Sequence, residues 1–447
     1  MTEKIKEEML QFINEGISDN ISWMEDNHPA DIAEVLSELK PENMLEIISL
    51  LDNQEIAQVI EHLDQELQKE IITSKEIDEI IDIFSYMSKD NITDILGNLS
   101  VDLREKLLNQ MKHGEAQILR NLLGYEIDSA GGIMTTEYIL LKETLTKKEA
   151  LEKIKEIGPR TEVIDIIYIN NDKKELVGTV DLRDILSAPD DTILAELMDE
   201  NLIYVTPEMD QEKVAYLVAK YDLTAIPVIN KNKVMLGIIT VDDVIDVIEE
   251  ENTEDMLRMA GVHEEESIDS PLKKSVIRRL PWLFINLFTA FLVSMTVSLF
   301  EEVIQQVVVL AVMMPIVAMM GGNAGNQTLS VVIRGIALGE LTLNKESWKL
   351  IIKQIVLGLI NGAVLGLFTG IVLYFVYGNP YLGLIIFLAM TVNILIAGLF
   401  GFLIPLGLKV LGVDPAMASA IFLTTATDIF GFFVFLWLAK VFINYLV

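Results

Sequence analysis

The chain has 447 residues, of which 51% are hydrophobic and 23% are charged, and its formal net charge is −33. This length exceeds what one hydrophobic core supports, so several domains are expected. The absence of Cys excludes disulfides, thiolate metal sites and Cys nucleophiles. The strongly negative net charge disfavours nucleic acid as a partner and favours divalent cations. The ordinary alternative is an acidic surface exposed to solvent.

Apolar and charged residues are segregated along the chain. After Leu280 there are six acidic and six basic residues, so the whole net negative charge belongs to the first 280 residues. The opening MTEKIKEEML has neither the basic nor the apolar region of a cleavable signal peptide. We therefore expect an acidic cytoplasmic part followed by a neutral part in the membrane.

Residues 1–130 are predicted to form an all-α superhelical domain. Short apolar stretches alternate with polar turns every 12 residues, as in LKPE at 39–42, LDNQ at 51–54 and LDQE at 63–66. Stacked short helices of this kind build a superhelical scaffold. The pattern alone fits a general interaction scaffold as well as it fits a sensor.

Residues 131–252 are predicted to hold a tandem pair of α/β units, about 131–197 and 198–252. The first unit ends in LVGTVDLRDIL and the second in MLGIITVDDVI. Both endings resemble the strand–turn–helix end of a CBS (cystathionine-β-synthase-type) domain. Such pairs are common as regulatory modules, so this resemblance alone does not specify a function.

In CBS pairs a final Asp often holds the ribose of an adenine nucleotide. Asp184 and Asp243 stand at that position in the two units. Thr240 supplies the usual preceding hydroxyl in the second unit, whereas Asp181 replaces it in the first. The first unit therefore departs from the pattern for ordinary nucleotide binding.

An acidic run, DDVIDVIEEENTED, closes the second unit and leads into residues 253–279, which are predicted to form a connecting helix. Like charges on one helical face repel, and a bound dication would reverse that effect. Four acids fall close to one face, namely Asp243, Asp246, Glu250 and Glu254. A solvated face is the usual explanation, but this run leads directly to the membrane part, where repulsion or its relief could move helices.

Residues 280–447 are predicted to form an all-α membrane domain with five helices, because uncharged stretches of roughly 20 residues can each cross the hydrocarbon core. The predicted spans are 281–300, 305–333, 351–377, 382–408 and 415–445. In the third span, glycines recur at every fourth position and predict close helix packing. These glycines are Gly358, Gly362, Gly366 and Gly370.

Basic residues predict the orientation of the spans. The loops after the first and third spans have none, whereas bases cluster before the first span, around the second-to-third loop and in the fourth-to-fifth loop. These bases are Lys273, Lys274, Arg278, Arg279, Arg334, Lys345, Lys349, Lys353 and Lys409, with Lys440 as an exception. The N-terminus is therefore expected in the cytoplasm and the C-terminus outside the cell or in the periplasm.

Polar groups in two spans are typical of a pore. PIVAMMGGNAGNQTL in the second span combines glycines with amides, which suits a wet cavity, with helix–helix hydrogen bonding as the alternative. In the fifth span, Asp428 is the one ionisable side chain well inside any span, and Thr424 and Thr425 share its face. A carboxylate there needs water, a cation or a proton; a protonated Asp holding the bundle together is the structural alternative.

A carboxylate with neutral oxygens makes a hard site that suits Mg²⁺, Ca²⁺ or Mn²⁺. Mg²⁺ dehydrates reluctantly, so one or two carboxylates can hold it through its waters. Two copies of Asp428 meeting on a dimer axis would supply two charges for one dication. The sequence does not distinguish among these cations or indicate coupling to other ions.

Over essentially the whole chain, the order of parts resembles the MgtE family of magnesium channels and transporters. The resemblance is carried by YEIDSAGGIMT, GIITVDDVIDVIEEENTED, PIVAMMGGNAGNQTL and TTATDIFGF. It implies a multi-pass homodimer in the lipid of the cell membrane, selective for Mg²⁺, with the pore on the two-fold axis. It also implies closure by Mg²⁺ bound among the cytoplasmic domains, with residues 253–279 as a plug helix.

The resemblance also implies functional residues. Asp428 is implied as the pore ligand for Mg²⁺, with Asn323 and Asn326 in the matching segment of the second span. Ten sensor acids are implied, namely Asp90, Asp94, Asp128, Glu212, Asp222, Asp243, Asp246, Glu251, Glu254 and Asp255. Some members bind ATP between the CBS units, and Arg183 and Asp184 fit such a site.

Three other classes are weighed against this one. A membrane-anchored nucleotide or cation sensor without transport would explain the CBS pair but not Asp428. An intramembrane aspartyl protease needs two carboxylates, and one chain offers only Asp428. An ATP-driven pump is disfavoured because the sequence has no GxxxxGK[ST]. No enzyme is expected, and no catalytic residue is assigned.

Overall fold

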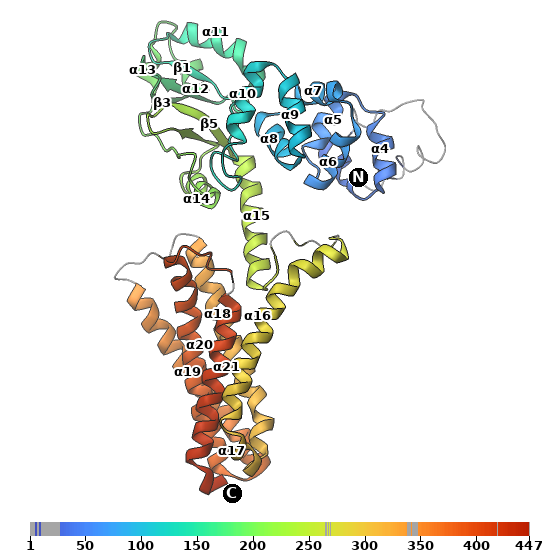
Figure 1. Cartoon of the computed structure of the whole chain (residues 1–447). Helices are drawn as coiled ribbons and strands as arrows, with labels where there is room; N and C mark the ends of the chain where they lie inside the picture. The colour runs from blue at the N-terminus through green and yellow to red at the C-terminus, as the bar shows by residue number, and fades with distance from the viewer. Residues whose placement is uncertain are drawn as a thin grey trace. The chain divides into compact units, whose positions relative to one another are not determined.

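The computed structural model describes residues 5, 6, 9, 27–263, 266, 268, 270–337, 341, 347–417 and 419–446. Contacts divide the chain into two compact units, Met1–Val247 and Ile248–Val447. Figure 1 shows helices and small sheets in the first unit and long helices in the second. Most of residues 1–26, with which the predicted helical domain begins, lie outside the described residues.

The first unit begins with short helices that form the predicted all-α superhelix. Each helix packs against the next but one along the chain, so that α3 contacts α5, α5 contacts α7, and α4 contacts α6. The helices are α3 (Pro29–Ser37), α4 (Pro41–Ile48), α5 (Asn53–Ile60), α6 (Gln65–Ser74), α7 (Ile77–Phe84), α8 (Lys89–Asn98), α9 (Val101–Gln110) and α10 (His113–Leu122).

The 12-residue repeat gives these short helices their boundaries. Asp52 and Asp64 precede α5 and α6, and each side chain accepts a hydrogen bond from a backbone N–H of the first turn, at 2.8 and 2.9 Å. Leu51 and Leu63, one position earlier, are buried in the core. The side-chain caps of α5 and α6, together with the buried residues that join successive helices, help to stabilise helices of only eight to ten residues.

The CBS pair follows with two small sheets. In the first, β1 (Leu140–Lys142) runs parallel to β2 (Ile166–Asn170), which pairs antiparallel with β3 (Leu176–Asp181). In the second, β4 (Ala225–Ile229) pairs antiparallel with β5 (Met235–Thr240). The helices of this region are α11 (Lys147–Ile157), the 3₁₀ turn η1 (Gly158–Arg160), α12 (Leu182–Ser187), α13 (Leu194–Leu197) and α14 (Gln211–Tyr221).

The two CBS units exchange their leading segments. Thr135, near the start of the first unit, bridges Ile238 in β5 of the second, and Asp199, near the start of the second unit, bridges Thr179 in β3 of the first. A Cβ on Gly237 would come within 2.5 Å of the Thr135 carbonyl oxygen. Glycine is therefore needed where the exchanged segment crosses the strand, and boundaries drawn along the sequence do not reveal this exchange.

The predicted connecting helix, residues 253–279, comprises parts of two helices. The helix α15 (Val241–Met259) continues from the end of the second CBS unit, and α16 begins only at Leu272. Gly261 has a φ of +72°, a conformation that ends helices, and Pro271 immediately precedes α16. Four residues between these helices, 264, 265, 267 and 269, lie outside the described residues.

The second unit is all-α and contains, among the described residues, five helices long and apolar enough to cross a membrane. The prediction of five spans is therefore confirmed by length and composition. The helices are α16 (Leu272–Ser298), α17 (Glu301–Gln306), α18 (Val309–Ala337), α19 (Ser347–Tyr377), α20 (Pro380–Val410), α21 (Ser419–Val441) and α22 (Ile443–Leu446).

The spans differ from the predicted ones mainly at their starts. The first helix begins at Leu272 rather than 281 and keeps Pro281 inside it. The short α17 separates the first two spans, so the second begins at Val309 rather than 305. Lys345, used in predicting the orientation, lies outside the described residues.

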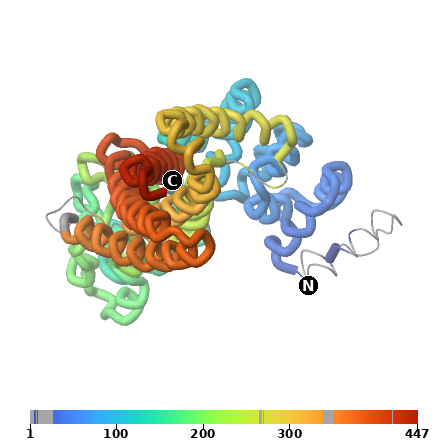
Figure 2. Tube along the Cα trace, turned by 90° about the horizontal axis from the view of Figure 1, so that it is seen from below, coloured from blue at the N-terminus to red at the C-terminus, as the bar shows by residue number. Residues whose placement is uncertain are grey.

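The glycine stripe of α19 packs against α20, as predicted. A Cβ on Gly362 would lie 2.7 Å from the Cα of Thr391, and one on Gly370 would lie 2.6 Å from the carbonyl oxygen of Gly383. The backbones of the two helices therefore approach directly, as small residues permit. Figure 2 views the bundle from below; α20 contacts α18, α19 and α21, and α16 contacts α21.

Candidate functional site

A cavity of about 1350 Å³ lies in the first unit, between the helical domain and the CBS pair. Its walls come from the end of α5, from α7 and α8, from the loops around β1 and β2, and from the start of α15. Ten acidic residues line it, namely Glu61, Asp78, Asp82, Asp90, Glu115, Glu137, Glu162, Asp242, Asp243 and Asp246. The same lining includes two lysines, Lys89 and Lys112, and one histidine, His62.

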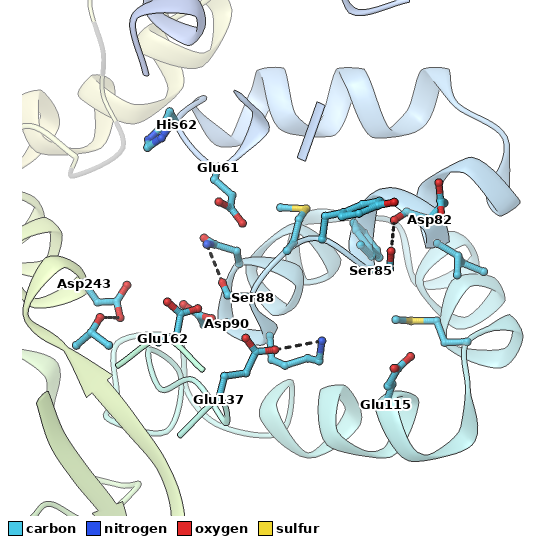
Figure 3. A pocket seen from close by; sticks show the side chains of 18 of the residues that line it. Glu61, His62, Asp82, Ser85, Ser88, Asp90, Glu115, Glu137, Glu162 and Asp243 are labelled. Carbon is cyan, nitrogen blue, oxygen red and sulfur yellow. Dashed lines mark hydrogen bonds and ion pairs between the residues drawn. The ribbon is translucent and has the colours of Figure 1, made fainter. Parts of the chain in front are cut away.

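Five of these acids form a group at one end of the cavity. In Figure 3, Asp90, Glu137 and Glu162 lie near the centre, Glu61 above them and Asp243 to the left. They come from α5, α8, the first CBS unit and α15. Residues far apart in the sequence therefore meet here, and we refer to this set of five as the acidic cluster.

Asp90, in the first turn of α8, is the most deeply buried member of the cluster. Its Oδ1 atom has no hydrogen-bond partner among the described residues. Burial raises the pKa of Asp90. An unpaired buried carboxylate oxygen is costly, so the site is suited to an additional cation or to its water shell.

Burial and mutual repulsion raise the pKa values of the carboxyl groups in the acidic cluster. Burial, with added repulsion from Asp90, raises the pKa of Glu61, Glu162 and Asp243 to about 7. Burial also raises the pKa of Glu137, although the Lys89 ammonium 3.4 Å away acts in the opposite sense. Several carboxylates with one nearby ammonium form a site whose charge a divalent cation would balance.

Local structure fixes the Asp243 carboxylate at the cavity wall. Asp243 lies in the first turn of α15, and the Thr240 hydroxyl donates a 2.6 Å hydrogen bond to its Oδ2 atom. The described residues include no group of three or more His, Asp or Glu side chains placed to hold one ion directly. Mg²⁺ usually keeps several of its waters, so an ion bridging these acids through water fits the separation better than a dehydrated one.

The structure brings together only some of the predicted sensor acids. Asp90, Asp243 and Asp246 line the same cavity. Asp94 is exposed on α8 and is not part of the lining. Three others lie outside it as well: Asp128 in the loop after α10, Glu212 in the first turn of α14, and Asp222 at its left-handed C-terminus.

A second acidic group lies in the second unit, at the end of α15. Arg258 forms ion pairs with Glu254 and with Asp414, which lies between α20 and α21. Burial, together with Asp414 and Glu251, raises the pKa of Asp255 to about 6. The predicted Glu251, Glu254 and Asp255 therefore do fall together, and Asp414 is a member that sequence analysis missed.

The end of α15 also packs against two of the long helices. Met259 lies on a buried cluster formed by Leu329 and Ile333 of α18 and Leu423 of α21, with Ala416 beside them. The acidic group is thus attached directly to the helices that carry the predicted pore residues.

The predicted pore residues lie on α18 and α21, which are in contact. The Cβ position of Gly322 is 3.8 Å from the Cγ2 atom of Thr424. Asp428 is half-buried, and no salt bridge among the described residues reaches it. The hydroxyls of Thr424 and Thr425 donate to carbonyls of their own helix, at Ala420 and Ile421.

One face of α18 is polar and exposed on the single chain. Asn323, Asn326, Gln327 and Ser330 are all exposed. Amide side chains facing hydrocarbon are unfavourable, so this face requires water or another protein surface.

The predicted nucleotide residues lie on α12. Arg183 and Asp184 are exposed in its first turn. The Asp181 side chain accepts a hydrogen bond from the Arg183 backbone N–H at 2.8 Å and so caps the helix. Asp181 therefore has a structural role at the position where the second unit has Thr240.

Several residues of these sites were missed from the sequence. Glu61, Glu137 and Glu162 belong to the acidic cluster, and Asn393 of α20 is fully buried beside α18 and α21. The three glutamates have no regular spacing from one another or from Asp90. Only the fold brings them together, so no sequence signal was available for them.

The fold and these sites define a multi-span membrane protein whose soluble part holds an acidic, cation-attracting cavity. Residues 27–128 match the family model of the MgtE intracellular N domain, and residues 130–191 and 194–250 match that of the CBS domain. Residues 314–438 match the MgtE model, described as a divalent cation transporter.

Relatives and solved structures agree with these matches. The chain is 36% identical over 337 residues to the magnesium transporter MgtE of Bacillus subtilis, covering 75% of this chain and 74% of the relative. It is 37% identical over 335 residues to that of Enterococcus faecalis, with coverages of 74% and 73%. The chain belongs to the MgtE family.

The soluble part also has counterparts among solved structures. The cytosolic domain of the Mg²⁺ channel MgtE in complex with ATP is 32% identical, with a TM-score of 0.52, and the match covers 54% of this chain and 99% of that one. The soluble part of a magnesium transporter is 29% identical, with a TM-score of 0.51 and coverages of 56% and 99%.

Proposed function

We propose that this protein carries Mg²⁺ across the cell membrane along a path formed by α18 and α21, and that Mg²⁺ bound on the cytoplasmic side closes the path. The observation that carries the proposal is Asp428, a half-buried carboxylate in a membrane helix without a basic partner among the described residues. Its relatives in Bacillus subtilis and Enterococcus faecalis are named magnesium transporters.

We further propose that two copies assemble with the polar face of α18 between them. Asn323, Asn326 and Gln327 are exposed on the single chain, within a helix long and apolar enough to span the membrane. A second copy would shield these amides from lipid and leave a wet path between the chains. Two Asp428 carboxylates near a two-fold axis would then balance the charge of one dication.

The acidic cluster supports the cytoplasmic sensor. Without a dication its carboxylates repel, and Mg²⁺ bridging them would draw the helical domain and the CBS pair together. The helix α15 is continuous from Asp242 and Asp243 in the cavity lining to Met259, which packs against α18 and α21. We propose that this helix couples Mg²⁺ binding in the cavity to the path, because its sequence contributes residues to both.

ATP is proposed as a second ligand, in the CBS pair. A solved relative of the cytosolic domain is described in complex with ATP. Here the exposed Arg183 guanidinium can bind a phosphate, and the neighbouring Asp184 carboxylate can accept hydrogen bonds from ribose hydroxyls.

The orientation that we propose for the membrane domain places the CBS pair and the N-terminus in the cytoplasm and the C-terminus on the opposite side of the membrane.

Flux of Mg²⁺ into liposomes that contain the purified protein tests the transport proposal. Asp428→Asn keeps the shape of the side chain and removes its charge, so we expect at least a tenfold loss of flux. Glu302→Gln makes the same change at an exposed carboxylate of α17 and should leave flux unchanged. Full flux through Asp428→Asn would exclude the proposed path, and no flux through the wild-type protein would favour a sensor without transport.

A further inference from the structure

Asn393 of α20 is a polar side chain that the proposed path does not use. It is fully buried, with 0% of its surface exposed, in a helix of membrane-spanning length. The nearby hydroxyls of Thr391, Thr425 and Thr427 bond to carbonyls of their own helices. The Asn393 amide instead donates a 2.9 Å hydrogen bond from Nδ2 to the carbonyl oxygen of Val317 in α18.

The other half of the same amide is unpaired. Its Oδ1 atom is buried and has no hydrogen-bond partner among the described residues. A buried, unpaired carbonyl costs free energy, and an apolar side chain of similar size would avoid that cost. Packing alone therefore does not account for an amide at this position.

Two glycines make room for this amide. A Cβ on Gly321 of α18 would lie 2.3 Å from Nδ2 of Asn393, and a Cβ on Gly431 of α21 would lie 2.7 Å from the same atom. The Asn393 side chain therefore occupies the space that both glycines leave free. Three helices meet at one amide, and a side chain on either glycine would displace the Asn393 amide from its present place.

This junction stands at the level of the proposed cation ligand. Gly431 follows Asp428 by three residues, less than one helical turn. On the other helix, Gly321 precedes Gly322, whose Cβ position is 3.8 Å from the Cγ2 atom of Thr424, one turn before Asp428. The junction therefore fixes the approach of α18 and α21 where Asp428 leaves its helix.

We propose that Asn393 is a positioning residue for cation selection: from behind the path, its amide sets the spacing of α18 and α21 and hence the place of the Asp428 carboxylate. This inference rests on the proposed Mg²⁺ transport. Because one wall of the path would be set by a single hydrogen bond and two glycine contacts, a small change at Asn393 should alter which hydrated dication fits. Its effect should therefore appear in selectivity and half-saturation rather than in the amount of folded protein.

The test compares Asn393→Leu with wild type in liposomes that contain the full chain. Leucine has a similar size and lacks the amide, so it fills the space without the bond to Val317. We expect the half-saturating Mg²⁺ concentration to rise about fivefold to tenfold, and the preference for Mg²⁺ over Ca²⁺ to fall by a similar factor. Thr391→Val, a half-buried neighbour whose hydroxyl bonds within its own helix, is the matched control and should change neither quantity.

A double substitution separates the junction from general loss of fold. Gly321→Ala alone should reproduce the loss of selectivity, because its Cβ displaces the Asn393 amide. In the Asn393→Ala background that clash is absent, so adding Gly321→Ala should cause little further loss. Additive losses, or a lower maximal rate with selectivity and half-saturation unchanged, would mean that Asn393 is merely structural and would overturn the inference.

A measurement independent of transport checks the spacing itself. The chain has no Cys, so a Gly322→Cys and Thr424→Cys pair reports on the approach of α18 to α21 by its rate of oxidative cross-linking. We expect Asn393→Leu to slow this cross-linking at least fivefold, and an unchanged rate would refute the positioning role. If wild type carried no Mg²⁺ while cross-linking still depended on Asn393, the transport proposal would fail and the spacing role would remain.

Discussion

Replacing Asp90 by Asn should stabilise the protein without Mg²⁺ and weaken its response to Mg²⁺. Asp90 is buried at the centre of the acidic cluster, and its Oδ1 atom has no partner among the described residues. Its charge helps to raise the pKa of Glu61, Glu162 and Asp243. Asparagine keeps the shape of the side chain and removes the charge that its neighbours repel.

The magnitude follows from these interactions. The pKa of Asp243 is raised from 3.8 to about 7, chiefly by burial and next by Asp90. Across a small, partly buried cluster, one like charge repels another by about 1–2 kcal/mol. Asp90→Asn should therefore raise the Mg²⁺-free stability at pH 8 by about 1–3 kcal/mol, or the apparent melting temperature by about 3–8 °C. Losing one acidic ligand should weaken Mg²⁺ binding about tenfold, which is about 1.4 kcal/mol.

The assay is thermal unfolding of the full chain in detergent, titrated with Mg²⁺ at pH 8. Asp102→Asn is the control, since Asp102 occupies the same first-turn position in α9, is exposed and does not line the cavity. It should melt and respond to Mg²⁺ as wild type does. A lower melting temperature for Asp90→Asn without Mg²⁺, or an unchanged Mg²⁺ response, would refute the view that repulsion in the cluster drives the sensor.

Three further predictions concern the pH dependence of the acidic cluster, the packing of α19 and the ion pairs at the end of α15. Raising the pH from 5 to 8 without Mg²⁺ should lower the melting temperature: the folded-state pKa of Asp243 is about 7 and its ordinary value 3.8, so the folded protein binds more protons between these values and loses stability as pH rises. Saturating Mg²⁺ should largely abolish this dependence. Gly362→Leu should destabilise the membrane domain by about 1–3 kcal/mol, measured by thermal aggregation, because even its Cβ would lie 2.7 Å from the Thr391 backbone; normal stability would contradict the tight packing. Arg258→Ala should destabilise the protein by about 1–3 kcal/mol in low Mg²⁺ and less in high Mg²⁺, because Asp414 loses its ion-pair partner; Arg258→Lys should restore part of the loss.

Local patterns predicted the order and type of the domains. The 12-residue repeat predicted the short helices of the first domain because an apolar stretch and a polar turn recur at a fixed spacing, and at Leu51 and Asp52 the turn supplies a buried side chain and a helix cap. Uncharged stretches predicted five spans because crossing a membrane depends on length and composition alone. The glycine stripe of α19 was also predictable from the sequence, because glycines at every fourth position lie on one face of a helix.

Boundaries were harder to predict where composition stays constant and geometry changes. The acidic and basic residues of 253–279 continue without interruption, and the break between α15 and α16 depends on the left-handed conformation at Gly261. The exchange between the CBS units depends likewise on backbone approach at Gly237. Neither feature has a periodicity that a sequence pattern can report.

The sequence by itself determined that this protein has an acidic soluble part, five apolar spans and one carboxylate well inside them. Net charge, apolar composition and periodicity are properties of residues that are close in the sequence, so they can be determined without knowledge of the fold. Only the tertiary structure decided which acids face one another, joining Glu61, Glu137 and Glu162 to Asp90 and Asp243. It also placed the amide of α20 between two glycines on different helices. Electrostatic repulsion and steric fit depend on distance in space, and the sequence does not indicate which of its distant residues are close to one another in the fold.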